Sequence, residues 1–302
     1  MEKQEKIPVL QPSEMLGFHS STFDLQTIIS VNKHPLFHIN RLETVVGKMS
    51  FPLPPHRKPL FDIIYIKTGY SKRIKGLTMY EFGKSSMFFL PAFQISQHEM
   101  MSSDTIGFFC HFDEKLFEFL PKNYLGDNYA FFKFESNPVI HLTNFASENV
   151  EAIFERLLSI YEEGEEMQKK LIASYLLALF EEVRNELPTQ PKKAKTASFQ
   201  ITESYKNALV KHIYEKQTIA EYAHLLNISS NYLNKCVISS INKTAQDLLN
   251  EMLILEAKTL LKYTDMQIAE VAVKLRNQSP SNFCRFFKSQ TGITPKEYLE
   301  MY

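Results

Sequence analysis

The segment Met266–Tyr298, MQIAEVAVKLRNQSPSNFCRFFKSQTGITPKEY, constrains the fold of this chain more than any other. Its first part carries apolar residues at the helical spacing i, i+3, i+4 and i+7: Ile268, Val271, Ala272 and Leu275. Ser279 is a preferred N-cap residue and Pro280 suits the first position of a helix, so a second helix is expected there. Gly292 is placed to end that helix. Two short helices joined by a tight turn indicate a helix-turn-helix.

The same pattern occurs upstream. Thr218 and Glu221 form a capping box that opens a helix, and Ser230–Asn242 predicts the helix that follows it. The segment Thr244–Thr264 contains neither Pro nor Gly and predicts a helix of about 30 Å. Such a helix would hold two recognition helices about one turn of DNA apart, roughly 34 Å.

At this point the chain shows a family resemblance. Residues 199–302 resemble the two-unit DNA-binding domain of AraC-family transcription regulators, through IAEYAHLLNISSNYLNK, LEAKTLL, IAEVAVKL and SNFCRFFKSQTGITPKEY. The sequence departs from the family pattern at three places. Arg276-Asn277 replace the usual Gly-Phe, an arginine usual near Met252 or Leu253 is absent, and Val237 replaces an aromatic residue. These departures put the packing of the two turns in question.

The resemblance assigns DNA contacts to the exposed faces of two recognition helices. An amide can bond an adenine edge twice, and arginine can do the same with guanine. Hydroxyl and lysine groups suit phosphates, which fix position without reading sequence. Cys284 would touch a thymine methyl group or simply pack, and solvation alone is the alternative for every polar residue in this set. The expected base contacts are Asn231, Asn234, Lys235, Ser281, Cys284 and Arg285, and the expected phosphate contacts are Ser230, Ser279 and Lys288.

The N-terminal part has a different texture, with short apolar runs separated by turn residues. These runs predict a small jelly roll. Two amphipathic helices follow at 146–163 and 165–187, and they would lie against the barrel, against each other or across a two-fold axis. The fold class is therefore α+β, with a cupin-like β-barrel before an all-α domain. The expected strands are 61–67, 71–74, 77–82, 87–90, 106–112, 131–135 and 139–142.

The expected domains are a cupin-like effector-binding and dimerisation domain at 1–187, a linker at 188–198 and the DNA-binding domain at 199–302. The linker prediction rests on the composition of Pro188–Gln200, PTQPKKAKTASFQ. Charge supports the division, because residues 188–302 carry a formal charge of +5 and residues 1–187 carry −5.

Histidines and aromatic residues of the N-terminal part raise the question of a bound ligand. The histidines lack the spacing of a cupin metal triad, so neither a metal nor a cofactor is expected. Two interpretations are open for the aromatic rings of the barrel: they fill its interior, which is favoured, or they line a small-molecule pocket. If a pocket exists, Arg41, His56, Arg57 and Lys58 would favour an anionic ligand. The histidines in question are His34, His38, His56, His98 and His111.

The sequence predicts a DNA-binding transcription regulator and not an enzyme. Its expected partners are double-stranded DNA, a second copy of the chain, a small-molecule effector and RNA polymerase. No membrane span or signal peptide is evident, and the three cysteines lack disulfide or metal spacing, so a cytoplasmic protein is expected. Two alternatives remain: an orphan regulator whose N-terminal domain only dimerises, and a cupin-like enzyme with a DNA-binding tail.

Overall fold

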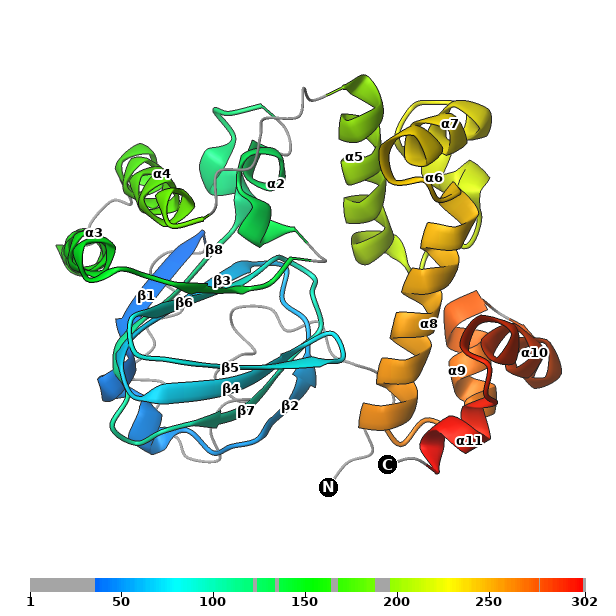
Figure 1. The fold of residues 1–302 in the computed structure, drawn as a ribbon, viewed down its shortest axis with the longest axis horizontal. Coiled ribbons are helices and arrows are strands. Elements are labelled where there is room, and N and C mark those ends of the chain that lie inside the picture. The colour runs from blue at the N-terminus through cyan, green and yellow to red at the C-terminus, as the bar shows by residue number, and fades with distance from the viewer. Residues whose placement is uncertain are drawn as a thin grey trace. The chain divides into compact units, whose positions relative to one another are not determined.

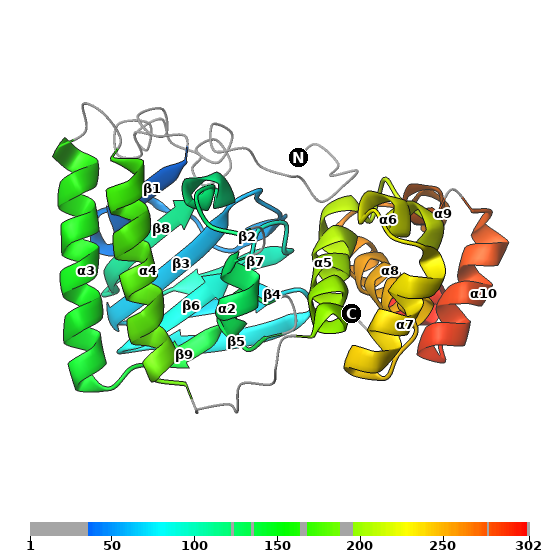
Figure 2. The ribbon, with the colours of Figure 1, turned by 90° about the horizontal axis from the view of Figure 1, so that it is seen from above.

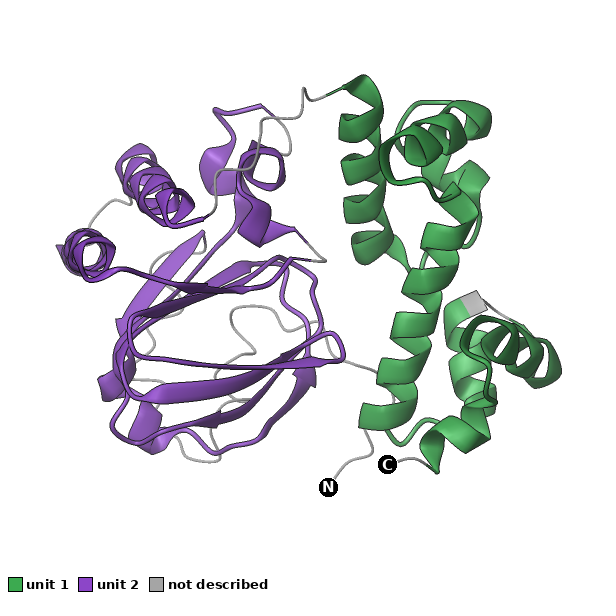
Figure 3. Ribbon diagram, in the orientation of Figure 1, with its two compact units in different colours: residues 1–8, 192–302 green, residues 9–191 purple. Residues whose placement is uncertain are grey.

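The computed structural model of the chain describes residues 36–121, 124–133, 136–163, 168–187, 196–276 and 278–300. Its strands and helices are shown in two views (Figure 1 and Figure 2). The chain divides into two compact units, one within residues 9–191 and one within residues 192–302 (Figure 3). We call them the sheet unit and the helical unit.

The sheet unit is built on two antiparallel sheets. The larger has the strand order β1-β8-β3-β6-β9, and the smaller has the order β2-β7-β4-β5. Strand β8 lies between β1 and β3, and its successive side chains point to opposite faces of the sheet, both of which are largely buried. The strands are β1 Phe37–Arg41, β2 Leu53–His56, β3 Phe61–Thr68, β4 Tyr70–Lys75, β5 Thr78–Gly83, β6 Ser86–Leu90, β7 Ser96–Met101, β8 Ile106–Phe112 and β9 Val139–His141.

Six of the seven expected strands are present, and the cupin-like two-sheet architecture is confirmed. The strand expected at 131–135 is wrong, because Ala130–Phe132 is a 3-10 turn. Phe131 and Phe132 both bury their rings in the same core, whereas successive residues of a strand face opposite sides. Strands β1, β2 and β7 were not among the expected strands, and the polar sequences of β2 and β7, LPPH and SQHEMM, lack an apolar alternation.

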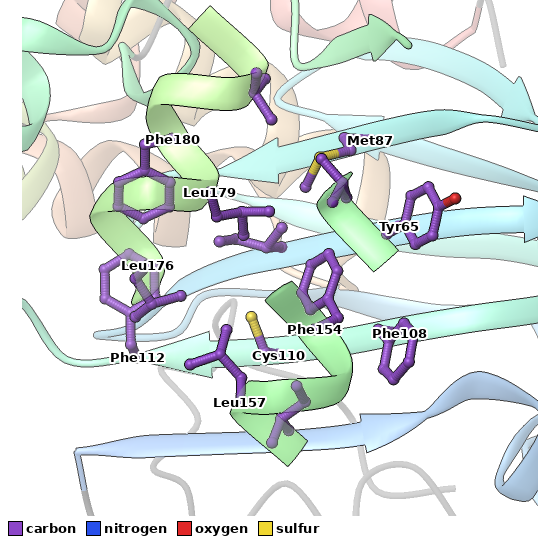
Figure 4. Packing of buried hydrophobic residues seen from close by; sticks show 14 of the residues in the cluster. Tyr65, Met87, Phe108, Cys110, Phe112, Phe154, Leu157, Leu176, Leu179 and Phe180 are labelled. Carbon is purple, nitrogen blue, oxygen red and sulfur yellow. The ribbon is translucent and has the colours of Figure 1, made fainter. Parts of the chain in front are cut away.

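Helices α3 (Asn144–Glu163) and α4 (Lys169–Asn185) lie side by side over the outer face of the larger sheet (Figure 2). Side chains of alternate strand positions, such as Tyr65, Phe108 and Phe112, pack against Phe154 and other residues of these helices (Figure 4). Two of the three placements expected for the helices are thus realised together, against the sheet and against each other.

This packing corrects the expectation that the aromatic rings fill the barrel. Tyr65, Phe89, Phe108 and Phe112 lie in the core between the larger sheet and the helices. A smaller core between the sheets contains Phe82, Phe88 and neighbouring aliphatic residues.

Helix α5 starts at Ala197 behind its N-cap Thr196, two residues before the start expected for the DNA-binding domain. The long helix predicted at 244–264 is α8, which we call the strut, and Thr244 and Asp247 form its capping box. The capping box predicted at Thr218 is also present, and a further one at Thr294 opens α11. The helices are α5 Ala197–His212, α6 Ile219–Leu225, α7 Ser230–Ile241, α8 Ala245–Tyr263, α9 Ile268–Arg276, α10 Pro280–Thr291 and α11 Pro295–Leu299. Within the sheet unit, the short helix α2 spans Tyr124–Asn128.

Candidate nucleic-acid interface

The first helix-turn-helix consists of α6 and α7. Glu221 accepts hydrogen bonds from the Thr218 hydroxyl and from nearby backbone N–H groups, which fix the start of α6 and lower the pKa of that carboxyl. The turn is closed by Asn227, whose φ of 56° is left-handed, and by the Ile228 N–H, which donates to the Ala223 carbonyl at 3.0 Å. The small side chain of Ala223 is buried.

The second helix-turn-helix consists of α9 and α10 and repeats this geometry. The Gln278 N–H donates to the carbonyl of buried Ala272 at 3.3 Å, as Ile228 does to Ala223. Gly292 ends α10 with a left-handed φ of 83°, as predicted. The departure Arg276-Asn277 falls at this turn, where the side chain of Arg276 and all of Asn277 lie outside the described residues.

The recognition helices α7 and α10 match residue by residue at a separation of 50 positions. Leu233 and Val237 are buried in the first, and Phe283 and Phe287 are buried in the second. The same shift relates three pairs of predicted contacts, each with the same degree of burial in both units. These pairs are the exposed Asn231 and Ser281, the half-buried Asn234 and Cys284, and the exposed Lys235 and Arg285.

Both recognition helices lie on the same side of α8 in two perpendicular views (Figure 1 and Figure 2). Helix α8 has 19 residues, which corresponds to about 28 Å. Neither α7 nor α10 contains an aspartate or a glutamate, so neither helix places a carboxylate against a phosphate backbone. This arrangement can place two helices in successive segments of the major groove.

Contacts within the unit position two of the predicted residues. Arg285 donates from Nη2 to the Asn282 Oδ1 at 2.6 Å, which holds its guanidinium along the exposed face of α10. Ser279 caps α10, because its Oγ accepts the Asn282 N–H. Its hydroxyl hydrogen stays available to a phosphate. Lys288 is exposed one turn further along the helix.

Contacts within the helical unit bear on two more of the predicted residues. The Asn234 Oδ1 accepts the Ala245 N–H at 3.0 Å, which ties this side chain to the start of α8 and competes with a two-bond contact with adenine. Ser230 is the first residue of α7 and matches Pro280, whereas Ser229 is the N-cap that matches Ser279. Sequence reasoning missed Ser229 because the spacing between the two units is not constant. Helices α6 and α9 correspond at a separation of 49 residues, whereas α7 and α10 correspond at 50.

The histidines of the sheet unit were not expected to form a metal site. Among the described residues, no group of three or more His, Cys, Asp or Glu side chains is arranged to hold a metal ion. His34 lies outside the described residues. Burial is the main reason that the pKa of His38 falls to about 4 and that of His56 to about 3, so both rings are neutral near pH 7.

These observations define a class. The helical unit is a tandem helix-turn-helix domain of the AraC type, and the chain is a transcription regulator of that type. Residues 222–301 match the family model described as a helix-turn-helix domain, which confirms the resemblance drawn from the sequence. In the part of the chain that is described, no helix combines the length and apolar character needed to cross a bilayer.

Known proteins similar to this chain carry matching descriptions. An uncharacterised HTH-type transcriptional regulator of Bacillus subtilis, YisR, is 24% identical over 255 residues, which cover 80% of this chain and 86% of that protein. A Staphylococcus aureus regulator of the same description is 33% identical over 87 residues, but these are 29% of this chain and 12% of the longer relative. Among solved structures, ToxT of Vibrio cholerae aligns over 89% of this chain and 98% of its own, at 17% identity and a TM-score of 0.39.

Proposed function

We propose that this regulator binds a specific DNA sequence through the exposed faces of α7 and α10 and that residues 1–187 control it, by binding an effector or by dimerising. The observation that carries the proposal is that α7 and α10, which lie on one side of α8, match position by position at a separation of 50 residues. Neither helix contains an aspartate or a glutamate. We keep the proposed division into a control domain at 1–187, a linker at 188–198 and a DNA-binding domain at 199–302.

The proposed base contacts are Asn231, Lys235, Ser281, Cys284 and Arg285, all of them on the two recognition helices. Lys235 and Arg285 stand at the same place in the two units, so each unit has one long cationic donor for base edges. Ser279 and Lys288 are proposed to hold phosphates. On the first unit, that role moves from Ser230 to Ser229, because an N-cap hydroxyl lies where backbone N–H groups also face an anion.

Arg285→Ala tests the proposal. A bidentate contact with guanine discriminates by about 1–3 kcal/mol, so affinity for the operator should fall roughly 5- to 150-fold, and affinity for unrelated DNA should fall much less. Lys288→Ala should instead weaken binding to all sequences and reduce the salt dependence. The operator is first selected from random DNA with the purified full-length protein, and gel-shift titrations then compare the variants.

Lys211→Ala is the matched control, since Lys211 is an exposed cation near the end of α5, a helix outside both helix-turn-helix pairs. It should leave operator affinity unchanged. An Arg285→Ala protein that keeps its circular dichroism spectrum and binds the operator as tightly as the wild type would contradict the assignment of α10 as a reading helix.

Control through the N-terminal region has two forms that an experiment can separate. Dimerisation alone predicts operator binding that no small molecule changes, and it corresponds to the orphan regulator. Effector control predicts that a ligand of the sheet unit alters operator affinity or transcription by RNA polymerase. Analytical ultracentrifugation with and without operator DNA measures the first form, and transcription in vitro with candidate ligands measures the second.

A further inference from the structure

One tyrosine contacts both halves of the helical unit. We call α6 with α7 the first pair and α9 with α10 the second pair. Tyr214 follows α5 and precedes α6, the first helix of the first pair. Its hydroxyl lies 2.8 Å from the Glu256 Oε2 on the strut, and the Lys274 Nζ of α9 lies 5.5 Å from the centre of its ring. A single side chain thus connects the first pair, the strut and the second pair.

The carboxylate that holds Tyr214 is buried in the middle of the strut. Glu256 is 1% exposed, although glutamate is almost never fully buried unless it has a partner. The Tyr214 hydroxyl donates to it, and a hydrogen bond to a charged acceptor is stronger than one between neutral groups. The position of the tyrosine against the strut is therefore well defined.

A second tyrosine attaches the same segment of chain to the strut. The Tyr205 hydroxyl on α5 donates to the carbonyl of Ala245, the first residue of α8, at 3.0 Å. Glu256 follows Ala245 by about three helical turns, roughly 16 Å, and lies on the same face of the strut. Two hydrogen bonds this far apart set the direction of α5 along the strut. Tyr222 of α6 packs on the Tyr205 ring, so the first pair takes its orientation from α5.

Lys274 brings the second pair to the same tyrosine. It lies on α9, which packs against the strut, two residues after Ala272, whose carbonyl accepts the N–H of Gln278 in the turn. An ammonium group over an aromatic face is attracted to the electrons of the ring. Those electrons become denser when the phenol donates its hydrogen to a carboxylate, because linked polar contacts polarise one another. The contacts with Glu256 and Lys274 therefore strengthen each other.

These directional contacts supply what apolar packing does not. Burial of apolar surface on the strut holds both pairs in place, but the hydrophobic effect has no direction and sets their rotation about the strut only loosely. Rotation matters for reading DNA, because neighbouring base pairs differ by roughly 34° about the helix axis. A contact that connects the two pairs at a fixed place determines which base pairs both recognition helices reach together.

We propose that Tyr214, held between Glu256 and Lys274, sets the orientation of α10 relative to α7 and so fixes the spacing of the two DNA segments that this regulator accepts. The inference rests on the proposed function, since it specifies the arrangement of DNA that the two recognition helices read. Tyr214 is a positioning residue, because it lies on neither recognition helix.

The first test compares operators of different spacing in gel-shift titrations with the full-length protein. One base pair added between the segments shifts one of them by about 3.4 Å and roughly 34°. Affinity of the wild type should fall at least about 5-fold, because a base contact is lost. Tyr214→Phe removes the hydroxyl and Lys274→Gln removes the cation. Each should reduce this spacing penalty at least about threefold, which is the smaller end of what either contact contributes.

The ratio of the two affinities separates positioning from a merely structural role. A variant that is only less stable weakens binding to both operators equally and leaves the ratio unchanged. Lys258→Gln is the matched control, since the Lys258 Nζ on α8 lies 5.7 Å from the centre of the Tyr298 ring on α11, a contact that does not reach the first pair. It should keep the ratio of the wild type.

The second test needs no DNA. Nitroxide labels are attached to Ser239→Cys and Ser289→Cys, which are exposed and equivalent positions on α7 and α10. A Cys284→Ser background removes the half-buried thiol, and Cys110 and Cys236 are buried. Double electron–electron resonance then gives the distribution of distances between the two recognition helices.

This distribution should be narrow in the wild type, broader in Tyr214→Phe and in Lys274→Gln, and unchanged in Lys258→Gln. A wild type that binds both spacings equally, a spacing penalty that neither variant reduces, or distributions of equal width would each overturn the proposal. If Tyr214→Phe does not fold, Lys274→Gln decides alone, because Lys274 is only half-buried. A wild type that selects no operator would contradict the proposed function, and the label distances would still decide whether Tyr214 orients the two helices.

Discussion

Asn234 joins the first recognition helix to the strut, and its replacement should show whether it supports the fold or reads DNA. Its Oδ1 accepts the Ala245 N–H at 3.0 Å, and Ala245 is buried at 1% exposure. Asn234→Ala removes the acceptor and leaves that donor buried, which costs about 1–3 kcal/mol. For a domain of roughly 100 residues, each kcal/mol lowers Tm by about 4–8 °C. The transition of the helical unit should therefore fall by at least about 4 °C.

Asn234→Asp separates the two roles. The carboxylate keeps an acceptor for Ala245 and lies at the start of α8, where the helix dipole favours negative charge, so Tm should return close to that of the wild type. Operator affinity should nevertheless fall, because the new charge faces phosphates. Far-ultraviolet circular dichroism and gel-shift titration of both variants provide the readouts. An unchanged Tm in Asn234→Ala would refute the structural role, and the reading role would then regain its place.

Two other predictions concern the sheet unit. The pKa of His38 and of His56 is near 6.5 in the unfolded chain, and burial lowers it to about 4 and about 3 in the folded protein. Between these values the folded state binds fewer protons than the unfolded state, so the free energy of unfolding decreases as pH falls below 6.5. The expected loss between about pH 7 and pH 5 is about 2 kcal/mol per histidine. Denaturant titrations at the two pH values measure this, and equal free energies would contradict the burial of neutral rings. Gly107→Ala should cost about 3 kcal/mol, because an added Cβ would lie 2.0 Å from the Tyr65 carbonyl oxygen of the neighbouring strand β3. Gly47→Ala, with nothing within 4 Å of its Cβ, should cost nothing, and similar losses in both variants would show that the clash is not the cause.

Much of the helical unit could be predicted because its signals are local. The capping boxes at Thr218, Thr244 and Thr294 and the glycine stop at Gly292 each depend on residues within one helical turn. The buried positions follow from the helical period for the same reason. Strands β3 and β8 were also evident, since each combines β-branched or aromatic residues over a short run.

The rest of the fold depends on contacts between distant residues. Strand β7 is polar in sequence and exists because it pairs with both β2 and β4. The sequence also does not say which face of β3 meets the helices and which meets the second sheet, because both faces are buried. The assignment of Tyr65, Phe89 and Phe108 to the interior of the barrel failed for this reason, whereas Phe82 and Phe88 do lie between the sheets.

The candidate sites divide in the same way. The sequence alone determined that the chain ends in two helix-turn-helix units on one long helix, and which helix faces are polar, because helical period and capping act within a few residues. Only the tertiary structure decided that Asn234 serves Ala245 and that Tyr214 lies between Glu256 and Lys274. The two hydrogen-bonded pairs among these residues are 11 and 42 positions apart, and no local spacing encodes their meeting. Burial makes these contacts important, because a polar or charged group without a partner is costly only where water is excluded.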